Sequence, residues 1–317
     1  MMERIASLEN LFSAWGKFSK GKHKRADIML FENNLEDNIF KLRNALLNCE
    51  YKHDNYKPFT VFDPKRRKIH KATVKDRLVH QGIVNIIEPI FNQRFIYDSY
   101  SCRLGKGTHA AVKRLRSFLN QASENNTKTV YALKCDVQKF FASVDHAILT
   151  NLLVKRIQDR STIKLLTTVI DSFYAVRGRA LPLGNLTSQL FANVYLHELD
   201  FYIRHELRLK YYLRYCDDFI ILNNDRKKLE KLTPQISSFL TSRLKLNLHP
   251  NKVFIRSYAQ GIDFLGYVLS PHATVIRTKT RNRILKKITK SNRASYLGLC
   301  KHANTHELTQ LLKTKIV

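Results

Sequence analysis

Two adjacent aspartates stand between two apolar runs in the second half of the chain. The runs Tyr211–Arg214 and Phe219–Leu222 flank the segment Tyr215–Asp218, which contains Asp217 and Asp218. Short apolar runs on both sides of a polar break predict strand, tight turn and strand. Like charges at a hairpin tip repel each other, and a bound divalent cation removes this repulsion. The segment therefore predicts an acidic metal site carried by a β-hairpin.

The charge of the whole chain indicates a polyanionic partner. The 317 residues include 55 Lys+Arg against 26 Asp+Glu, a formal net charge of +29 at pH 7. Such a field attracts nucleic acid, and anionic lipid is the alternative. No stretch has the apolar length of a membrane span and the N-terminus has no apolar signal core, so we expect no membrane partner. The five scattered cysteines form no Cys-x-x-Cys pair, which favours a cytoplasmic protein without a disulfide framework or zinc site.

The middle of the chain alternates between strand and helix patterns. Residues 130–135 predict a buried strand that ends at Asp136. Asp145 can cap a helix that reaches about residue 157. A second helix is expected after Ser188, because apolar residues recur there at helical spacing.

The rest of this region completes a recognisable order of elements. After the aspartate hairpin, a helix is expected from Asp225, kinked or split by Pro234, and then a strand at 253–255. The order β-α-β-β-α-β is that of a split βαβ unit, so we predict an α+β fold with a ferredoxin-like sheet. This topology brings the end of the first strand beside the hairpin tip. Asp136 and Asp217 are therefore expected to converge.

Converging carboxylates suit phosphoryl transfer with two metal ions about 4 Å apart. Asp136 and Asp217 would supply carboxylate ligands, the carbonyl of Val137 a further ligand, and Asp218 a supporting carboxylate. The predicted cofactor is a pair of Mg²⁺ ions, with Mn²⁺ as a substitute. The alternative for the Asp-Asp pair is ordinary turn chemistry, because Asp favours turns.

A series of short blocks, in the family's order, resembles the reverse transcriptases over nearly the whole chain. Each block is weak alone, whereas the set in register is a strong signal. The resemblance implies a right-hand polymerase with basic fingers, a ferredoxin-like palm and a short helical thumb, acting as an RNA-directed DNA polymerase. In chain order the blocks are Lys75–Gln81, Ser101–Gly107, Asp136–Phe141, Leu181–Gln189, Tyr215–Asp218, Leu248–Lys252 and Gly261–Tyr267.

The resemblance also implies how the chain is divided. Residues 1–129 would form the fingers with a helical N-terminal region, and 130–269 the palm, including a fingers-like insertion around 158–182. Residues 270–317 would form the thumb, where basic residues far outnumber the single acid. One-signed charge of this kind fits a grip on a phosphate backbone, and the thumb candidates are Arg281, Lys286 and Lys287.

Further roles are carried over from the family. Phe141 lies five residues after Asp136, where a steric gate would exclude the 2′-hydroxyl, while Phe140 is the better candidate for core packing. Gly184 would let the backbone approach template or nucleotide. Lys252 is a candidate general acid for pyrophosphate, with a salt bridge as the alternative. The other candidates are Arg67, Lys75, Arg77 and Arg103 for the triphosphate or template phosphates, Leu183 and Gln189 beside the dNTP, and Phe264, Leu265, Gly266 and Tyr267 as primer grip.

The subfamily signal lies in the sequence LGNLTSQ, residues 183–189. Most reverse transcriptases have Gln-Gly-x-x-x-Ser-Pro there, whereas Leu183 replaces the Gln and Gln189 replaces the Pro. This combination resembles the enzymes of diversity-generating retroelements, whose copying is error-prone at template adenines. The implied partners are a structured template RNA, the primer or cDNA, dNTPs and a small basic helical accessory protein.

Two alternatives stay open at this point. A phage-defence reverse transcriptase would share much of the pattern and would work with its own noncoding RNA. A protein of another class, which binds nucleic acid but has lost catalysis, would explain the charge alone. The intact Asp136, Asp217 and Asp218 argue against the second alternative.

Overall fold

The sheet of the computed structural model has the strand order of a split βαβ unit. Strands β3 (Tyr131–Asp136), β4 (Tyr212–Tyr215), β5 (Asp218–Asn223) and β6 (Phe254–Ser257) are arranged β4-β5-β3-β6, and each neighbouring pair is antiparallel. This is the ferredoxin-like order, with the first strand in the middle beside the third and fourth. The predicted α+β fold with a ferredoxin-like sheet is confirmed.

The structure describes residues 1–63 and 65–314, so the last three residues of the predicted thumb lie outside the described residues. The chain divides into two compact units. The first contains residues 1–96, 137–201 and 239–247, and the second contains 97–136, 202–238 and the chain from 248 onward. Among the helices of the described residues, none combines the length and apolarity that crossing a membrane requires.

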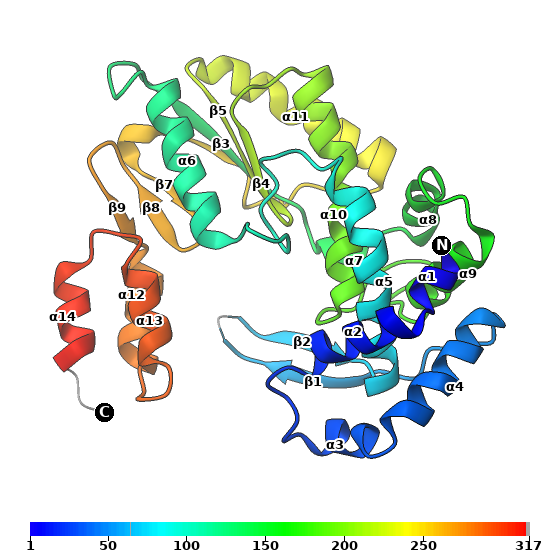
Figure 1. Ribbon diagram of the computed structural model, residues 1–317. Helices are drawn as coiled ribbons and strands as arrows, with labels where there is room; N and C mark the ends of the chain where they lie inside the picture. Colours follow the sequence, from blue (N-terminus) through cyan, green and yellow to red (C-terminus); the bar gives the residue numbers. More distant parts are fainter. Residues whose placement is uncertain (64, 315–317) are drawn as a thin grey trace. The chain divides into compact units, whose positions relative to one another are not determined.

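The sheet of the second unit is covered on one face by helix α6 (Thr108–Ala122), which runs along β4 and β5 (Figure 1). Leu115 and Leu119 of α6 are fully buried and belong to one apolar core with Ile220 and Leu222 of β5. Alternate residues of a strand point to the same face. Asp218, two residues before Ile220, therefore lies on the face that α6 covers.

The same core continues into the C-terminal elements. A second, three-stranded antiparallel sheet joins β7 (Ile262–Phe264), β8 (Tyr267–Leu269) and β9 (Thr274–Ile276). The helices α12 (Thr278–Lys287), α13 (Arg293–Cys300) and α14 (His306–Thr314) follow, drawn from orange to red in Figure 1. The other elements of this unit are a π-helix at Tyr202–Glu206, a 3-10 helix at Tyr258–Gln260 and most of α11 (Arg226–Leu244).

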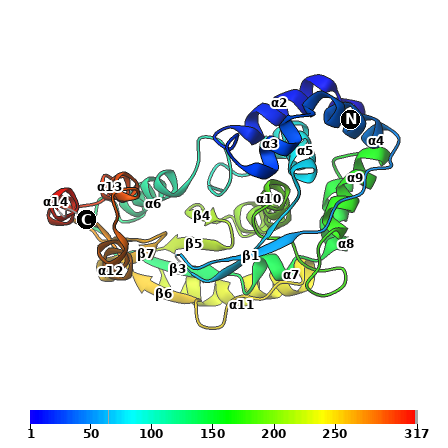
Figure 2. The same cartoon turned by 90° about the horizontal axis from the view of Figure 1, so that it is seen from below.

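The first unit is mainly helical, and α5 (Val74–Asn92) lies at its centre. Figure 2 shows α5 between α2 (Leu8–Ser19) and α10 (Leu186–Phe201), the two helices with which it makes its main contacts. The Thr73 side chain accepts a hydrogen bond from the Asp76 amide and so caps the start of α5. The other elements are α1 (Met2–Ile5), α3 (Ala26–Glu32), α4 (Leu35–Leu47), β1 (Lys57–Val61), β2 (Arg67–Lys71), α7 (Phe140–Ser143), α8 (His146–Val154) and α9 (Arg160–Asp171).

Several sequence-based boundaries need correction. The helix α8 begins after Asp145, whose Oδ1 accepts a hydrogen bond from the Ile148 amide, as predicted. The next predicted helix, α10, begins at Leu186 rather than after Ser188. Pro234 was predicted to kink or split its helix; the split is wrong, because α11 continues through Pro234, and the kink stays a prediction. Pro234 is exposed, so water can satisfy the carbonyl that loses its hydrogen bond.

Candidate active site

The register of the sheet brings two of the predicted carboxylates together. Asp136, the last residue of β3, lies directly opposite Asp218, the first residue of β5. Opposite residues in an antiparallel pair have their Cβ atoms about 5 Å apart on one face. Asp217 precedes Asp218 in the hairpin turn, and its pKa is raised partly by the negative charge of Asp136. The convergence expected from the sequence is therefore present.

A buried arginine supports the tip of this hairpin. Tyr215 pairs with Asp218, which leaves Cys216 and Asp217 as a two-residue turn, with Cys216 at a φ of 54°. Such a positive φ is uncommon for a non-glycine residue. The Arg214 side chain is fully buried. It donates one hydrogen bond to the Cys216 carbonyl and one to Ser99 Oγ, each at 3.1 Å. These bonds hold the strained turn that carries Asp217.

Burial and the charges of neighbouring carboxylates raise the pKa values of Asp217 and Asp218. Burial raises the pKa of Asp217, and the neighbouring Asp136 raises it further. Burial also raises the pKa of Asp218 to about 6, although Lys134 opposes the shift. A cation bound beside these carboxylates would oppose the rise of both pKa values, because it stabilises the ionised forms.

Two lysines partly neutralise the cluster. Lys252 Nζ lies 2.8 Å from Asp136 Oδ1, and Lys134 Nζ lies 3.4 Å from Asp218 Oδ2. The predicted general acid Lys252 is thus in the salt bridge that was its alternative role. Its side chain is 41% exposed, so it can leave Asp136 at little cost.

The acidic cluster fits a divalent cation. The described residues contain no ready-made group of three His, Cys, Asp or Glu ligands. However, Asp218 Oδ1 is buried and has no hydrogen-bond partner among the described residues. It can serve as a ligand, because Mg²⁺ prefers oxygen ligands. Asp136, Asp217 and the backbone carbonyl of Val137, the next residue after Asp136, are the other predicted ligands. A cation would satisfy the unpartnered oxygen and relieve the repulsion of the carboxylates.

The basic candidates for phosphate binding differ in how far they are engaged. Arg67 of β2 is exposed, and no ion pair of this side chain occurs among the described residues. Lys75 pairs with Asp54 at 2.9 Å, and the half-buried Arg77 pairs with Asp27 at 2.7 Å. In the second unit, Arg103 donates to the Ser99 carbonyl at 2.9 Å. Arg67 is therefore the candidate whose guanidinium is most available to a phosphate.

The two phenylalanines after Asp136 differ in burial as predicted. Phe140 is 1% exposed and its ring packs 6.4 Å from that of Tyr195, centroid to centroid. Phe141 is half-buried. The role of Phe141 as a steric gate stays a prediction, as do the roles of Leu183 and of Gln189, which lies in the first turns of α10.

Gly184 has a packing function within the first unit. Its φ is 107°, and a Cβ there would meet Ile69 Cγ2 of β2 at 2.6 Å. The adjacent Leu183 carbonyl accepts a hydrogen bond from the His70 amide at 3.0 Å. The glycine therefore lets the β1–β2 hairpin lie against residues 183–184, in addition to any approach of template or nucleotide.

We expect Gly184→Ala to lower the stability of the first unit by about 2 kcal/mol, because both φ and the contact with Ile69 oppose a side chain. Thermal unfolding measures the loss. The matched control is Gly21→Ala, since Gly21 also has a positive φ (71°) but no atom within 4 Å of the added Cβ. A larger loss for Gly21→Ala would contradict the packing function of Gly184.

The predicted primer-grip block forms a hairpin. Phe264 pairs with Tyr267, so Leu265 and Gly266 make a two-residue turn, and both have positive φ (50° and 91°). Positive φ at both positions is the geometry of a type I′ turn. Phe264 is buried, and Tyr267 donates from its hydroxyl to the Leu299 carbonyl of α13 at 3.0 Å. Contact of this hairpin with a primer stays a prediction.

The helix α12 combines a buried apolar residue with several exposed cations. Ile284 is buried in the core, whereas Arg281, Lys286 and Lys287 are exposed. Contact of these exposed cations with a phosphate backbone stays a prediction.

We expect the triple change Arg281→Gln, Lys286→Gln and Lys287→Gln to weaken RNA binding and flatten its salt dependence. For single-stranded RNA, the logarithm of the binding constant falls linearly with the logarithm of the salt concentration. Removing one cation that neutralises a phosphate should reduce the steepness of this line by about 0.7, because one fewer counterion is released. The measurement is the Kd for template RNA across a salt series. The matched control changes the exposed Lys227, Lys228 and Lys231 of α11 to Gln. Equal slopes for the α12 variant and the wild type would exclude α12 from the RNA contact.

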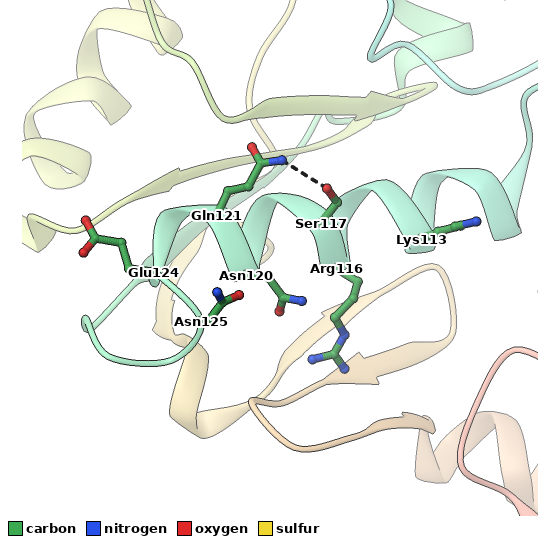
Figure 3. Close-up of a pocket in the computed structure, with 7 residues that line it drawn as sticks. All are labelled: Lys113, Arg116, Ser117, Asn120, Gln121, Glu124 and Asn125. Carbon is green, nitrogen blue, oxygen red and sulfur yellow. Dashed lines mark hydrogen bonds between the residues drawn. The ribbon is translucent and has the colours of Figure 1, made fainter.

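A polar hollow of about 610 Å³ lies along α6, lined by seven residues of this helix and the following turn (Figure 3). Its lining includes none of Asp136, Asp217 and Asp218, so the hollow is separate from the carboxylates.

A ferredoxin-like sheet with paired aspartates at the ends of its central strands defines the palm of a right-hand polymerase. Comparisons agree: residues 52–269 match the family model "Reverse transcriptase (RNA-dependent DNA polymerase)", well over half of the chain. The chain belongs to the reverse transcriptase family. The prediction of an RNA-directed DNA polymerase is confirmed at the level of the family.

Individual relatives are distant. Protein YkfC of Escherichia coli K12 is 24% identical over 270 residues, which are 71% of this chain and 70% of YkfC. The group II intron-encoded protein LtrA of Lactococcus lactis is 23% identical over 271 residues, 64% of this chain and 44% of LtrA. Apo telomerase of Candida tropicalis has a TM-score of 0.54 at 12% identity, covering 79% of this chain and 52% of telomerase. The chain thus spans about half of LtrA and of telomerase, and the telomerase likeness supports the fold alone.

Sequence reasoning missed two residues that support the carboxylates, Arg214 and Lys134. Each is a cation whose two neighbours within its strand are uncharged. Buried cations need partners, so each was a detectable signal. Lys134 was the clearer one, because it lies two residues before Asp136 and hence on the same face of β3.

Proposed function

We propose that this protein extends a DNA strand on an RNA template, with Asp136, Asp217 and Asp218 as its catalytic carboxylates. The observation that carries the proposal is the register of Asp136 with Asp218 beside the Asp217 turn, in a chain of the reverse transcriptase family. The net charge of +29 supports RNA and DNA as the bound polyanions. A protein that binds RNA without catalysis would not need three neighbouring carboxylates, whose mutual repulsion must be compensated.

The residues of the site would act on the reacting groups as follows. Asp136 and Asp217, with the Val137 carbonyl, would hold Mg²⁺, and Mn²⁺ as a substitute. Asp218, whose Oδ1 has no hydrogen-bond partner among the described residues, would be a supporting carboxylate ligand. Bound there, the ions would lower the pKa of the primer 3′-hydroxyl and neutralise the triphosphate and leaving pyrophosphate. Lys252, released from Asp136, would donate a proton to pyrophosphate. Arg67 would bind triphosphate oxygens through its planar guanidinium.

Primer extension tests this proposal directly. The assay supplies an RNA template, an annealed DNA primer, labelled dNTPs and Mg²⁺, with a DNA template of the same sequence in parallel. DNA products of template length on RNA are the expected result. Absence of extension with Mg²⁺ and with Mn²⁺, in protein that binds the primed RNA, would contradict the function.

We further propose that copying is error-prone, as in diversity-generating retroelements, and that a structured RNA and a small basic helical protein assist it. The supporting observation is Leu183 in place of the family's Gln. Leucine cannot hydrogen-bond to the nucleotide or template, so selection would rest on shape and stacking. A defence enzyme acting with its own noncoding RNA is the alternative, and it requires no such errors.

We expect Leu183→Gln to reduce misincorporation by up to about tenfold, most of all opposite template adenine, because about 1.4 kcal/mol of added discrimination gives that factor. The measurement is sequencing of cDNA made by both proteins on one RNA with accessory factors present. Template cytosine, guanine and uracil in that RNA serve as internal controls. Wild-type copying of adenine as accurate as that of the other bases would favour the defence alternative.

A further inference from the structure

We propose that Lys134 is a positioning residue that fixes Asp218 to the β7–β8 hairpin and, through that hairpin, to the start of α12. The inference rests on the proposed polymerase function for its catalytic consequence. Its structural part stands on contacts within the second unit. We call the connected residues Asp218, Lys134, Asp263 and Arg277 the polar chain.

The first step of the polar chain lies on the face of the sheet that carries the carboxylates. Lys134 and Asp136 share a face of β3, and Asp218 is diagonal to Lys134 across the β3–β5 pair. Lys134 Nζ lies 3.4 Å from Asp218 Oδ2, and the lysine side chain is only 12% exposed. The other oxygen of Asp218 has no hydrogen-bond partner among the described residues. Lys134 is thus the cation that orients this carboxylate within the protein.

The second step connects the lysine to the predicted primer-grip hairpin. Lys134 Nζ donates to the Asp263 carbonyl at 3.0 Å and lies 5.9 Å from the centre of the Phe264 ring. Asp263 and Phe264 belong to β7, and 129 residues separate Asp263 from Lys134 in sequence. An ammonium group has three donors, so it can hold the carboxylate and the carbonyl at once.

The third step reaches α12, the first helix of the predicted thumb. The Asp263 carboxylate pairs with the guanidinium of Arg277, the residue immediately before α12. The Arg277 amide also donates to the Gly266 carbonyl in the hairpin turn, at 2.9 Å. Both contacts fix the start of α12 to the hairpin that Lys134 holds. A displacement of α12 would therefore be transmitted to Asp218 through the side chains of Arg277, Asp263 and Lys134 and the backbone of Asp263.

The consequence is that Lys134 keeps the catalytic carboxylate and the hairpin in one arrangement. A half-buried charge that loses its partner must rotate, recruit water or take up a proton, so removing the ammonium would free both ends. Lys134 would act on the reaction through Asp218, which it contacts, and through the hairpin. Its effect should appear in the rate of the chemical step more than in substrate binding.

Lys134→Met tests the proposal, because methionine keeps the length but removes the charge. We expect kcat for single-nucleotide addition to fall about tenfold to a hundredfold, with the KM for dNTP changed less than about threefold. Independently of activity, hydrogen exchange of the amides of residues 262–269 should become about tenfold faster in protein free of metal and RNA, while exchange in α13 is unchanged. Lys134→Arg keeps the charge and should restore most of the protection.

A double-mutant cycle tests the connection to α12. Arg277→Met should also accelerate exchange of the hairpin, and combined with Lys134→Met it should add less than its separate effect, because both changes break the same polar chain. Lys128→Met, at an exposed lysine paired only with Glu124 among the described residues, is the matched control and should add nothing.

Unchanged hairpin exchange in Lys134→Met, or fully additive effects of Lys134→Met and Arg277→Met, would overturn the proposal. A wild-type protein that extends no primer would contradict the proposed function instead. The exchange measurements would still decide whether the polar chain exists.

Discussion

Replacing Asp217 with asparagine is expected to reduce DNA synthesis on RNA by at least about a thousandfold. Asparagine keeps the size of the side chain but lacks the charge that would hold a metal ion, and about 4 kcal/mol of lost transition-state stabilisation gives that factor. Binding of primed RNA should stay within about threefold of wild type, because affinity comes mainly from Lys and Arg. Single-turnover extension and a binding titration on the same preparation measure both quantities.

The control for this change is Asp37→Asn, at an exposed aspartate of α4 in the first unit. It removes the same charge and should leave extension unchanged. Asp217→Asn should not unfold the protein, since it relieves repulsion with Asp136. Near-normal dNTP incorporation by Asp217→Asn would remove Asp217 from the catalytic site.

Shortening Phe141 to alanine is expected to raise the use of rNTP relative to dNTP by about a hundredfold. The reason is that an aromatic ring beside C2′ excludes the 2′-hydroxyl by contact, and a barrier of about 3 kcal/mol corresponds to this factor. The observation behind the prediction is the five-residue spacing from Asp136, together with the half-buried position of Phe141. The measurement compares kcat/KM for one rNTP and its dNTP.

Phe140→Ala is the matched control because it removes the same ring one residue away. Phe140 is in the core against Tyr195, so its loss should lower stability by about 3 kcal/mol or more and leave the rNTP/dNTP ratio unchanged. If the rNTP/dNTP ratio changed for Phe140→Ala and not for Phe141→Ala, Phe140 and not Phe141 would be the steric gate.

The inner strands of the central sheet were predictable because they are short, mainly apolar runs with clear ends. The strand at 130–135 and the Asp217 hairpin are buried, and burial imposes the apolar pattern that sequence reasoning detects. The β1–β2 hairpin was not predicted for the opposite reason. All residues of β1 are exposed, and β2 consists largely of basic residues, so no alternation marks either strand.

The supporting side chains of the site were harder to predict than the carboxylates. Asp136 and Asp218 meet because strand register brings them together, and register follows from the order of elements. Lys134 acquires its role from Asp263, and Arg214 from Ser99, which are distant in sequence. Such pairings depend on how loops and hairpins pack, and the local pattern of a strand contains no information about that packing.

The core that the palm sheet shares with the C-terminal helices limits how evolution can exchange the predicted thumb. Ile284 of α12 and Leu312 of α14 belong to one apolar cluster with Leu269 of β8 and Leu115 of α6. A chain ended at residue 269 would uncover this surface and lose cooperativity with the sheet, as elements of one core unfold together. The helices of the predicted thumb therefore do not form a separate module that could be exchanged without changing the sheet. Changes of their exposed charges would leave this core intact, whereas replacement of the helices would require rebuilding the inner layer of the sheet as well.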